Sequence, residues 1–164
     1  MPVVIRTYLE LPRAAAFRPA WGDFPDLRVT REAPAPPSLY RMLYRTVGDL
    51  YAWRDRWDWS DSEIAAHLAR PEVSLHVARR GDDIVGFYEL LRGTDGIEIA
   101  YFGLLPAFVG RGLGKHLLSL AVREAFTLGQ RVWLHTCTLD HPSALPNYLA
   151  RGFVPYRTET YAQQ

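Results

Sequence analysis

The stretch VGRGLGK, residues 109–115, decides how this chain is expected to fold, because it is a glycine-rich turn between a predicted strand and a predicted helix. The strand is the apolar run 97–105, which Pro106 ends. After the turn, apolar residues recur at the 3.6-residue spacing of a helix with one buried face over 113–128, and Gly129 is expected as its left-handed C-terminal cap. The turn therefore presents backbone N–H groups at the positive end of a helix dipole, which favours phosphate binding.

The rest of the chain predicts strands and helices arranged around this turn. In chain order, the predicted strands cover residues 3–11, 73–80, 84–91, 97–105, 132–138 and 152–160, and the predicted helices cover 39–47, 49–57, 61–70, 113–128 and 142–150. Residues 13–37 are rich in proline and are expected to be irregular. Ser60 and Glu63 match a capping box at the start of the third helix. This order favours an α+β sandwich, a mixed sheet with helices on both faces.

Size and composition indicate one globular domain. The chain has 164 residues, of which 48% are apolar and 23% charged, enough to bury a core. Its formal net charge of +1 favours neither nucleic acid nor an anionic membrane as a partner. A single cysteine, Cys137, excludes an internal disulfide and fits a reducing compartment. With neither a leader-like segment nor a membrane-spanning apolar run, we expect a cytoplasmic protein, and a homodimer is left open.

Two common phosphate-binding motifs do not fit the turn. A Walker loop needs Ser or Thr after Gly-Lys, but His116 stands there, and its first glycine place holds Val109. A dinucleotide fingerprint needs the spacing Gly-x-Gly-x-x-Gly, which Gly110, Gly112 and Gly114 do not have. The alternative is that this strand-to-helix turn has a purely structural role and binds no ligand.

The turn resembles the pattern Gln/Arg-x-x-Gly-x-Gly/Ala of the GNAT superfamily of acyl-CoA-dependent N-acetyltransferases. Gly112 and Gly114 fill its two glycine places, whereas Val109 stands where the family has a polar residue. A second family pattern, Asn-x-x-Ala-x-x-x-Tyr-x-x-x-Gly-Phe, is similar to HPSALPNYLARGF at residues 141–153, with His141 in place of Asn. The resemblance covers about residues 84–153, and the chain before residue 71 agrees only in the order of its elements.

The resemblance implies a single acetyltransferase domain over residues 1–164, whose mostly antiparallel central sheet is splayed between its fourth and fifth strands, 97–105 and 132–138. It also implies acetyl-CoA as co-substrate, no metal, and direct acetyl transfer in a ternary complex to a primary amine, with a small molecule favoured. The residues expected to bind coenzyme A are Leu104, Leu105, Val109, Gly110, Arg111, Gly112, Leu113, Gly114, Lys115, His141 and Ala144. Among them, Arg111 and Lys115 are expected to support the phosphates in place of a polar side chain at position 109.

Tyr148 is the expected general acid. Thioester aminolysis expels a thiolate, and a phenol beside the sulfur can donate a proton to it. The resemblance places Tyr148 in that role, because it stands in register with Gly152 and Phe153. The alternative is an aromatic side chain that only packs on its helix.

Glu98 is the expected general base. On a regular strand it shares a face with Ala100, Phe102 and Leu104, and burial in an apolar row raises the pKa of a carboxyl group toward neutrality. Its position 14 residues before Gly112 is similar to that of the catalytic glutamate in histone-acetylating members of the superfamily. A water molecule or His141 could serve as the base instead, and Glu98 could simply reach solvent or pair with an arginine.

The resemblance places the acceptor beside the helices that follow the first strand, where aromatic residues and aspartates alternate. Tyr40, Trp53 and Trp57 are the candidate acceptor-binding residues, because an aromatic wall with acidic groups suits an amine with an apolar body. Core packing is the alternative for the two tryptophans. A protein or peptide acceptor, a non-catalytic acyl-CoA-binding regulatory module and an interaction domain stay open as other functions. His135 and Cys137 lack a third ligand at metal spacing, so no metal site is expected.

Overall fold

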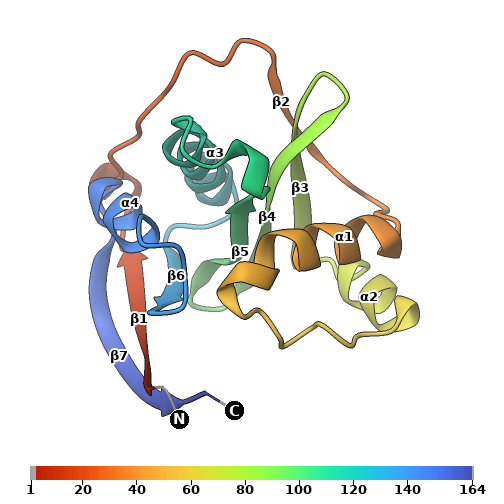
Figure 1. Ribbon diagram of the computed structural model, residues 1–164. Coiled ribbons are helices and arrows are strands. Elements are labelled where there is room, and N and C mark those ends of the chain that lie inside the picture. The colour runs from red at the N-terminus through yellow and green to blue at the C-terminus, as the bar shows by residue number, and fades with distance from the viewer. Residues whose placement is uncertain (1–2, 164) are drawn as a thin grey trace.

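The computed structural model describes residues 3–163, which form one mixed sheet with helices on both faces (Figure 1). The strands are β1 (Val3–Leu11), β2 (Leu27–Arg31), β3 (Val73–Arg80), β4 (Asp83–Gly93), β5 (Gly96–Leu104), β6 (Val132–Cys137) and β7 (Val154–Ala162). The α-helices are α1 (Pro37–Gly48), α2 (Asp61–Leu68), α3 (Leu113–Leu128) and α4 (Ala144–Ala150), with 3-10 turns η1 (Ala14–Ala16), η2 (Asp49–Tyr51) and η3 (Pro106–Phe108). The sheet order in these residues is β2-β3-β4-β5-β6-β1-β7, and only the β5–β6 pair is parallel.

Each face of the sheet carries its own apolar cluster. On one face, α3 and α4 pack on the sheet, and the α3 residues that point inward include Leu117, Ala121 and Ala125 at the predicted helical spacing. On the other face, α1 and α2 cover the sheet with a cluster that includes Leu43 and Phe87. The predicted α+β sandwich is therefore confirmed.

The sheet opens between β5 and β6, as the resemblance implied. These two strands pair only at Ile97 with Val132 and at Glu98 with Trp133. Beyond these positions β6 pairs with β1 and β5 with β4, so β5 and β6 diverge. The splay leaves backbone groups of β5 without a strand partner on one side, at the place where a ligand can enter.

Two elements differ from the sequence-based expectation. Residues 27–31, expected to be irregular, form β2, an edge strand that pairs antiparallel with β3; the partner that stabilises it lies about fifty residues away, where local patterning cannot reveal it. Residues 49–57 are not a helix, because only η2 is helical and Ala52 then takes a left-handed conformation, φ 57°. A left-handed residue ends a helix, so the chain turns back beneath α1.

Two helix ends show what the local sequence can and cannot specify. The capping box before α2 is confirmed: Ser60 Oγ accepts from the backbone N–H of Glu63 at 3.2 Å, and Glu63 Oε1 accepts from the N–H of Ser60 at 3.2 Å. Gly129 does follow α3, but its φ of −162° is extended, so the expected left-handed cap was wrong. A side-chain carbon at Gly129 would lie 2.9 Å from Ile97, so close packing on β5 accounts for the glycine. In the described part of the chain, no helix is both long and apolar enough to span a membrane.

Candidate active site

A cavity of about 450 Å³ lies where β5 and β6 diverge. Its walls come from β5, β6, the start of α4, and residues 51–59, which follow α1. Glu98, His135 and Tyr148 all line it, although they lie on three different elements. The splay of the sheet therefore creates one space that the candidate acid, the candidate base and the glycine-rich turn share.

The glycine-rich turn at the mouth of this cavity has the backbone conformation that its sequence suggests. Gly110 and Gly112 have φ values of 85° and 78°, in the left-handed region that side chains disfavour. Gly112 is the N-cap of α3 and supplies no side-chain cap, so the first amides of the helix keep free hydrogen-bonding capacity. These amides and the helix dipole suit an anionic group such as a pyrophosphate.

The side chains of the turn divide into three kinds. Val109 and Gly114 line the cavity, and Leu113, the first residue of α3, is buried. Arg111 and Lys115 are exposed. The apolar side chain of Val109 thus leaves the charge at this end of the site to the arginine and the lysine.

Leu104 and Leu105, both expected to bind the cofactor, differ in what their backbone offers. The N–H of Leu105 donates to the carbonyl of Val85 at 2.9 Å, so β4 already uses it. Backbone groups alternate sides along a strand, so those of Leu104 point to the open side toward the cavity, which Leu104 also lines. Of the two, only Leu104 is placed to hold a thioester carbonyl or a pantetheine amide.

Glu98 stands at the apex of the splay, the last position where β5 still pairs with β6. It does not share a face with Phe102 and Leu104, as the simple alternation predicted. The pairing register between β4 and β5 shifts at Ala100, a β-bulge that reverses which residues face which side. As a result, Phe102 and Leu104 pack on the α3 side, and Glu98 lies on the face of Tyr101.

The surroundings of Glu98 change its acid–base behaviour. Its side chain is only 16% exposed, and burial raises its pKa above the ordinary carboxyl value, with the negative charge of Glu89 adding to the effect and Arg56 opposing it. His135 Nε2 lies 4.0 Å from Glu98 Oε2, and burial together with Arg6 lowers the pKa of His135. A carboxyl with a raised pKa beside a neutral imidazole is suited to accept a proton from an amine.

Tyr148, on α4, is 8% exposed and has its ring held edge-to-face against Phe153, with 6.0 Å between ring centroids. Burial, and secondarily the charge of Asp140, raises its pKa above the ordinary phenol value, so its hydroxyl stays protonated at neutral pH. Gly152, next in the motif, has a φ of 101°, and a side-chain carbon there would lie 2.1 Å from the carbonyl oxygen of Ala16. The Gly-Phe pair thus fixes the position of the tyrosine.

His141, which replaces the usual Asn, orders the chain before α4. Its Nδ1 accepts from the backbone N–H of Ser143 at 3.1 Å and lies 2.7 Å from the Ser143 hydroxyl. A bond to the amide two residues ahead is what an Asn side chain would make in the same place. His141 and Ala144 both line the cavity, beside Asn147, which the sequence reasoning did not single out.

The three candidate acceptor residues separate in the structure. Trp53 lines the cavity and packs edge-to-face on Tyr101, with 4.8 Å between centroids. Tyr40 is buried in the core and hydrogen-bonded to Glu89, and Trp57 packs beneath Arg45 and Arg54 outside the cavity lining. Of the three, only Trp53 is therefore positioned to touch an acceptor.

Arg56 was not among the predicted site residues, and it lines the cavity together with Trp59, one of the aromatic residues of the predicted acceptor segment. Residues 49–57 were expected to form a helix, so the position that Arg56 takes in the non-helical segment after η2 could not be read from the sequence. Within residues 3–163, no group of three or more His, Cys, Asp or Glu side chains is placed to hold a metal ion.

Comparison with known proteins gives two kinds of match in sequence. A model described as the acetyltransferase (GNAT) family matches residues 38–153. An uncharacterised N-acetyltransferase of Mycobacterium tuberculosis is 31% identical over 104 residues, which cover 62% of this chain and 66% of that protein. A mycothiol acetyltransferase of Corynebacterium efficiens is 35% identical over 74 residues, covering 44% of this chain and 25% of that protein. The chain thus spans between a quarter and two thirds of these relatives.

Solved structures share the fold at low sequence identity. A GCN5-related N-acetyltransferase from Kribbella flavida is 19% identical with a TM-score of 0.65, and the match covers 95% of this chain and 56% of that one. An aminoglycoside acetyltransferase from an uncultured soil metagenomic sample, in complex with trehalose, is 17% identical with a TM-score of 0.62, covering 77% of this chain and 87% of that one.

Proposed function

This chain belongs to the acetyltransferase (GNAT) family, and from this premise we propose that it transfers an acetyl group from acetyl-CoA to a primary amine within a ternary complex. The observation that carries the proposal is the meeting of three features in one cavity. These are the uncapped start of α3, the splayed edge of β5 with Glu98, and the protonated phenol of Tyr148.

The described residues fit coenzyme A at the start of α3. The two left-handed glycines and the uncapped amides of the first turn leave the backbone accessible to an anionic group, since a side-chain carbon at Gly110 would meet no atom within 4 Å. Arg111 and Lys115 stand at its exposed edge, and Leu104 offers backbone groups along the route into the cavity. Acetyl-CoA supplies the activated thioester; the protein supplies the binding surface and the proton transfers.

Glu98 takes up the proton that the amine loses as its nitrogen forms a bond to the carbonyl carbon, directly or through a water molecule. Tyr148 donates its proton to the sulfur as the carbon–sulfur bond breaks, so the products are an amide and a free thiol. Holding the amine and the thioester together supplies a large part of the rate. Position and burial support both roles: the raised pKa of Glu98 suits a proton acceptor, and the raised pKa of Tyr148 keeps its hydroxyl protonated until the sulfur leaves.

The acceptor that the site suits best is a small primary amine with an apolar or aromatic body. Trp53, Trp59 and Tyr101 give the cavity an aromatic wall, and Asp55 adds an acidic group that can attract an ammonium. A peptide or protein amine is the second candidate, because Arg54 and Asp55, which line the cavity, are exposed to solvent.

The proposal is tested by free-thiol release from acetyl-CoA against a panel of amines, namely aromatic monoamines, an aminoglycoside and a short peptide with a free N-terminus. We expect release that depends on both substrates, fastest with an aromatic amine. A parallel thermal-shift measurement should show stabilisation of about 2.7 kcal/mol when acetyl-CoA is present at 100 times its Kd. Stabilisation with no release from any amine would support the non-catalytic module, and no stabilisation would contradict the proposal.

A further inference from the structure

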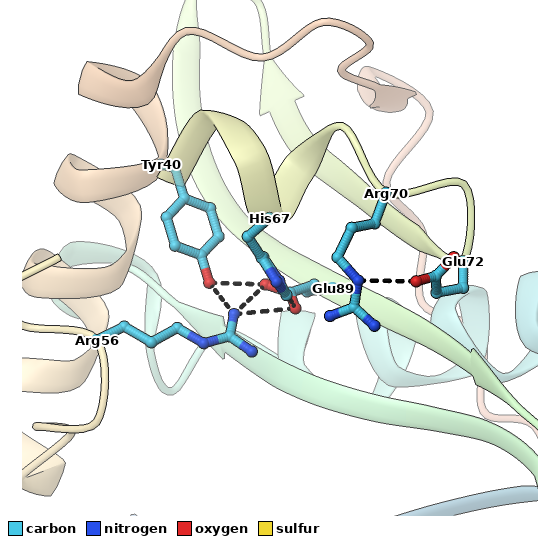
Figure 2. A network of polar contacts seen from close by, with 6 residues as sticks. All are labelled: Tyr40, Arg56, His67, Arg70, Glu72 and Glu89. Atoms are coloured by element: carbon cyan, nitrogen blue, oxygen red, sulfur yellow. Dashed lines mark hydrogen bonds and ion pairs between the residues drawn. The ribbon is translucent and has the colours of Figure 1, made fainter. Parts of the chain in front are cut away.

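Behind the cavity wall, Glu89 of β4 is fully buried, with 0% of its surface exposed. Figure 2 shows the polar network around it, in which Tyr40 of α1, His67 of α2 and Arg56 converge on its carboxylate. Oε1 accepts from Tyr40 Oη at 2.7 Å and from Arg56 Nη1 at 2.7 Å, and Oε2 lies 2.9 Å from His67 Nε2 and 3.0 Å from Arg56 Nη1. An acidic residue therefore holds three elements together although it does not line the cavity itself.

Glu89 is ionised in this setting. Burial alone would raise its pKa, but the hydrogen bond from His67, the charge of Arg56 and the hydrogen bond from Tyr40 together hold it below the ordinary carboxyl value. Because a carboxylate only accepts hydrogen bonds, His67 Nε2 carries the proton of their contact. Each carboxylate oxygen is thus paired, as a buried charge requires.

Arg56 connects this buried carboxylate to the cavity. It comes from residues 52–60, a segment without helix or strand that forms the acceptor side of the cavity. Its side chain is 13% exposed, and its guanidinium lies over the rings of Trp59 and Tyr101, 4.9 and 4.6 Å from their centroids. Arg45 and Arg41 of α1 bind the carbonyls of Trp57 and Trp59, whereas the Arg56–Glu89 ion pair ties the segment to the sheet.

The same ion pair lies next to Glu98. In the β4–β5 register, Glu89 faces Tyr101 and Leu91 faces Glu98, so the two glutamates are near neighbours on one face of the sheet. The charged or titratable groups around Glu98 are Glu89 from β4, Arg56 from the 52–60 segment and His135 from β6, with Arg6 of β1 and Asp55 further along the cavity. Because Glu89 offsets the charge of Arg56, no net positive charge from this pair stabilises the Glu98 carboxylate.

We propose that Glu89 is a positioning residue for acetyl transfer, which holds Arg56 and the 52–60 segment against the sheet and balances the charge of Arg56 beside Glu98. The inference rests on the proposed function for its kinetic readout. It assigns Glu89 no contact with either substrate.

The test compares Glu89→Gln with the control Glu72→Gln, which removes a carboxylate of the same kind from the exposed Arg70 pair seen beside the network in Figure 2. In Glu89→Gln we expect the KM for the amine to rise about tenfold, since small displacements at a reacting site can cost up to about 100-fold. The KM for acetyl-CoA should stay within about twofold, because the α3 cradle is untouched. The acid limb of the pH profile, where kcat/KM falls as Glu98 becomes protonated, should move to lower pH. The reason is that the positive charge of Arg56, no longer balanced by Glu89, favours the Glu98 carboxylate.

A double variant separates the two effects. Glu89→Gln combined with Arg56→Met removes both charges, so the acid limb should return toward its wild-type position while the KM for the amine stays high. If Glu89→Gln does not fold, Arg56→Lys carries the test, because it keeps the charge but loses the guanidinium stacking and should raise the KM for the amine alone.

Hydrogen–deuterium exchange supplies a readout that does not need activity. Amides of residues 52–60 should exchange faster in Glu89→Gln than in Glu72→Gln, with α3 unchanged in both. If the amides of residues 52–60 exchange faster in Glu89→Gln but the wild-type protein acetylates no amine, the proposed function is refuted, and Glu89 still positions this segment. Unchanged exchange, amine KM and acid limb in a folded Glu89→Gln protein would overturn the inference.

Discussion

Tyr148 lines the cavity and its ring packs against Phe153, so the hydroxyl can be removed with little change in packing. We expect Tyr148→Phe to lower kcat by about 100-fold or more, because a general acid contributes about 10²–10⁴ to a rate. The KM for acetyl-CoA should change little. Steady-state kinetics checks this, with Tyr156→Phe on the exposed part of β7 as the control. Equal kcat in the two variants would remove Tyr148 from the mechanism.

Glu98 gives the reaction a pH dependence whose sign follows from its environment. Because burial raises its pKa, the active carboxylate form is lost at a higher pH than for an exposed glutamate, so kcat/KM should fall as pH drops through that raised pKa. We expect Glu98→Gln to lower kcat/KM by about 100-fold and to abolish this acid limb. A pH–rate profile checks it, and an identical acid limb in the variant would point to His135 or another group.

Single residues also show where sequence reasoning stops. Tyr148 could be found from its motif, because a motif within one helix and its following turn is local. The face occupied by Glu98 could not, because the bulge at Ala100 depends on how β4 pairs with β5. Arg56 was missed because its partner Glu89 lies 33 positions away.

The turn before α3 is the element on which cofactor binding depends. We expect Gly112→Asp to abolish the stabilisation by acetyl-CoA, because it puts a side chain and a negative charge into the anion cradle. Gly81→Asp is the matched control, since Gly81 has a similar φ of 59°, open space around it, and a place in the β3–β4 hairpin away from the cavity.

A side chain in the left-handed region should lower the free energy of unfolding of both variants by about 1 kcal/mol. The unfolding temperature of each variant without ligand therefore shows whether it has folded. Thermal shift with and without acetyl-CoA then isolates binding. A full acetyl-CoA shift in Gly112→Asp would contradict the cradle.

Elements with strong local patterns were predictable, and those that depend on distant partners were not. The period of α3 and the capping box of α2 lie within one segment, so the sequence specifies them. The strand β2 and the non-helical course of residues 52–60 depend on contacts with β3, α1 and Glu89.

Across the whole molecule, two apolar clusters on opposite faces share one sheet, so we propose that residues 3–163 unfold as a single domain. Leu43→Ala on the α1 face and Leu117→Ala on the α3 face should each lower the free energy of unfolding by about 2–5 kcal/mol. Both should move one common transition, measured by denaturant with fluorescence and circular dichroism. Separate transitions for the two faces would show two independent units.

The sequence by itself determined the class of fold, the start of α3 and the identity of the tyrosine, because periodicity, capping and turn chemistry act over a few neighbouring residues. Only the tertiary structure decided which groups meet in the cavity. It opened the sheet at Glu98, placed Trp53 in the wall while burying Tyr40, and paired Arg56 with Glu89. Such meetings depend on strand register and on the burial of charges, which are properties of contacts between residues far apart in the chain.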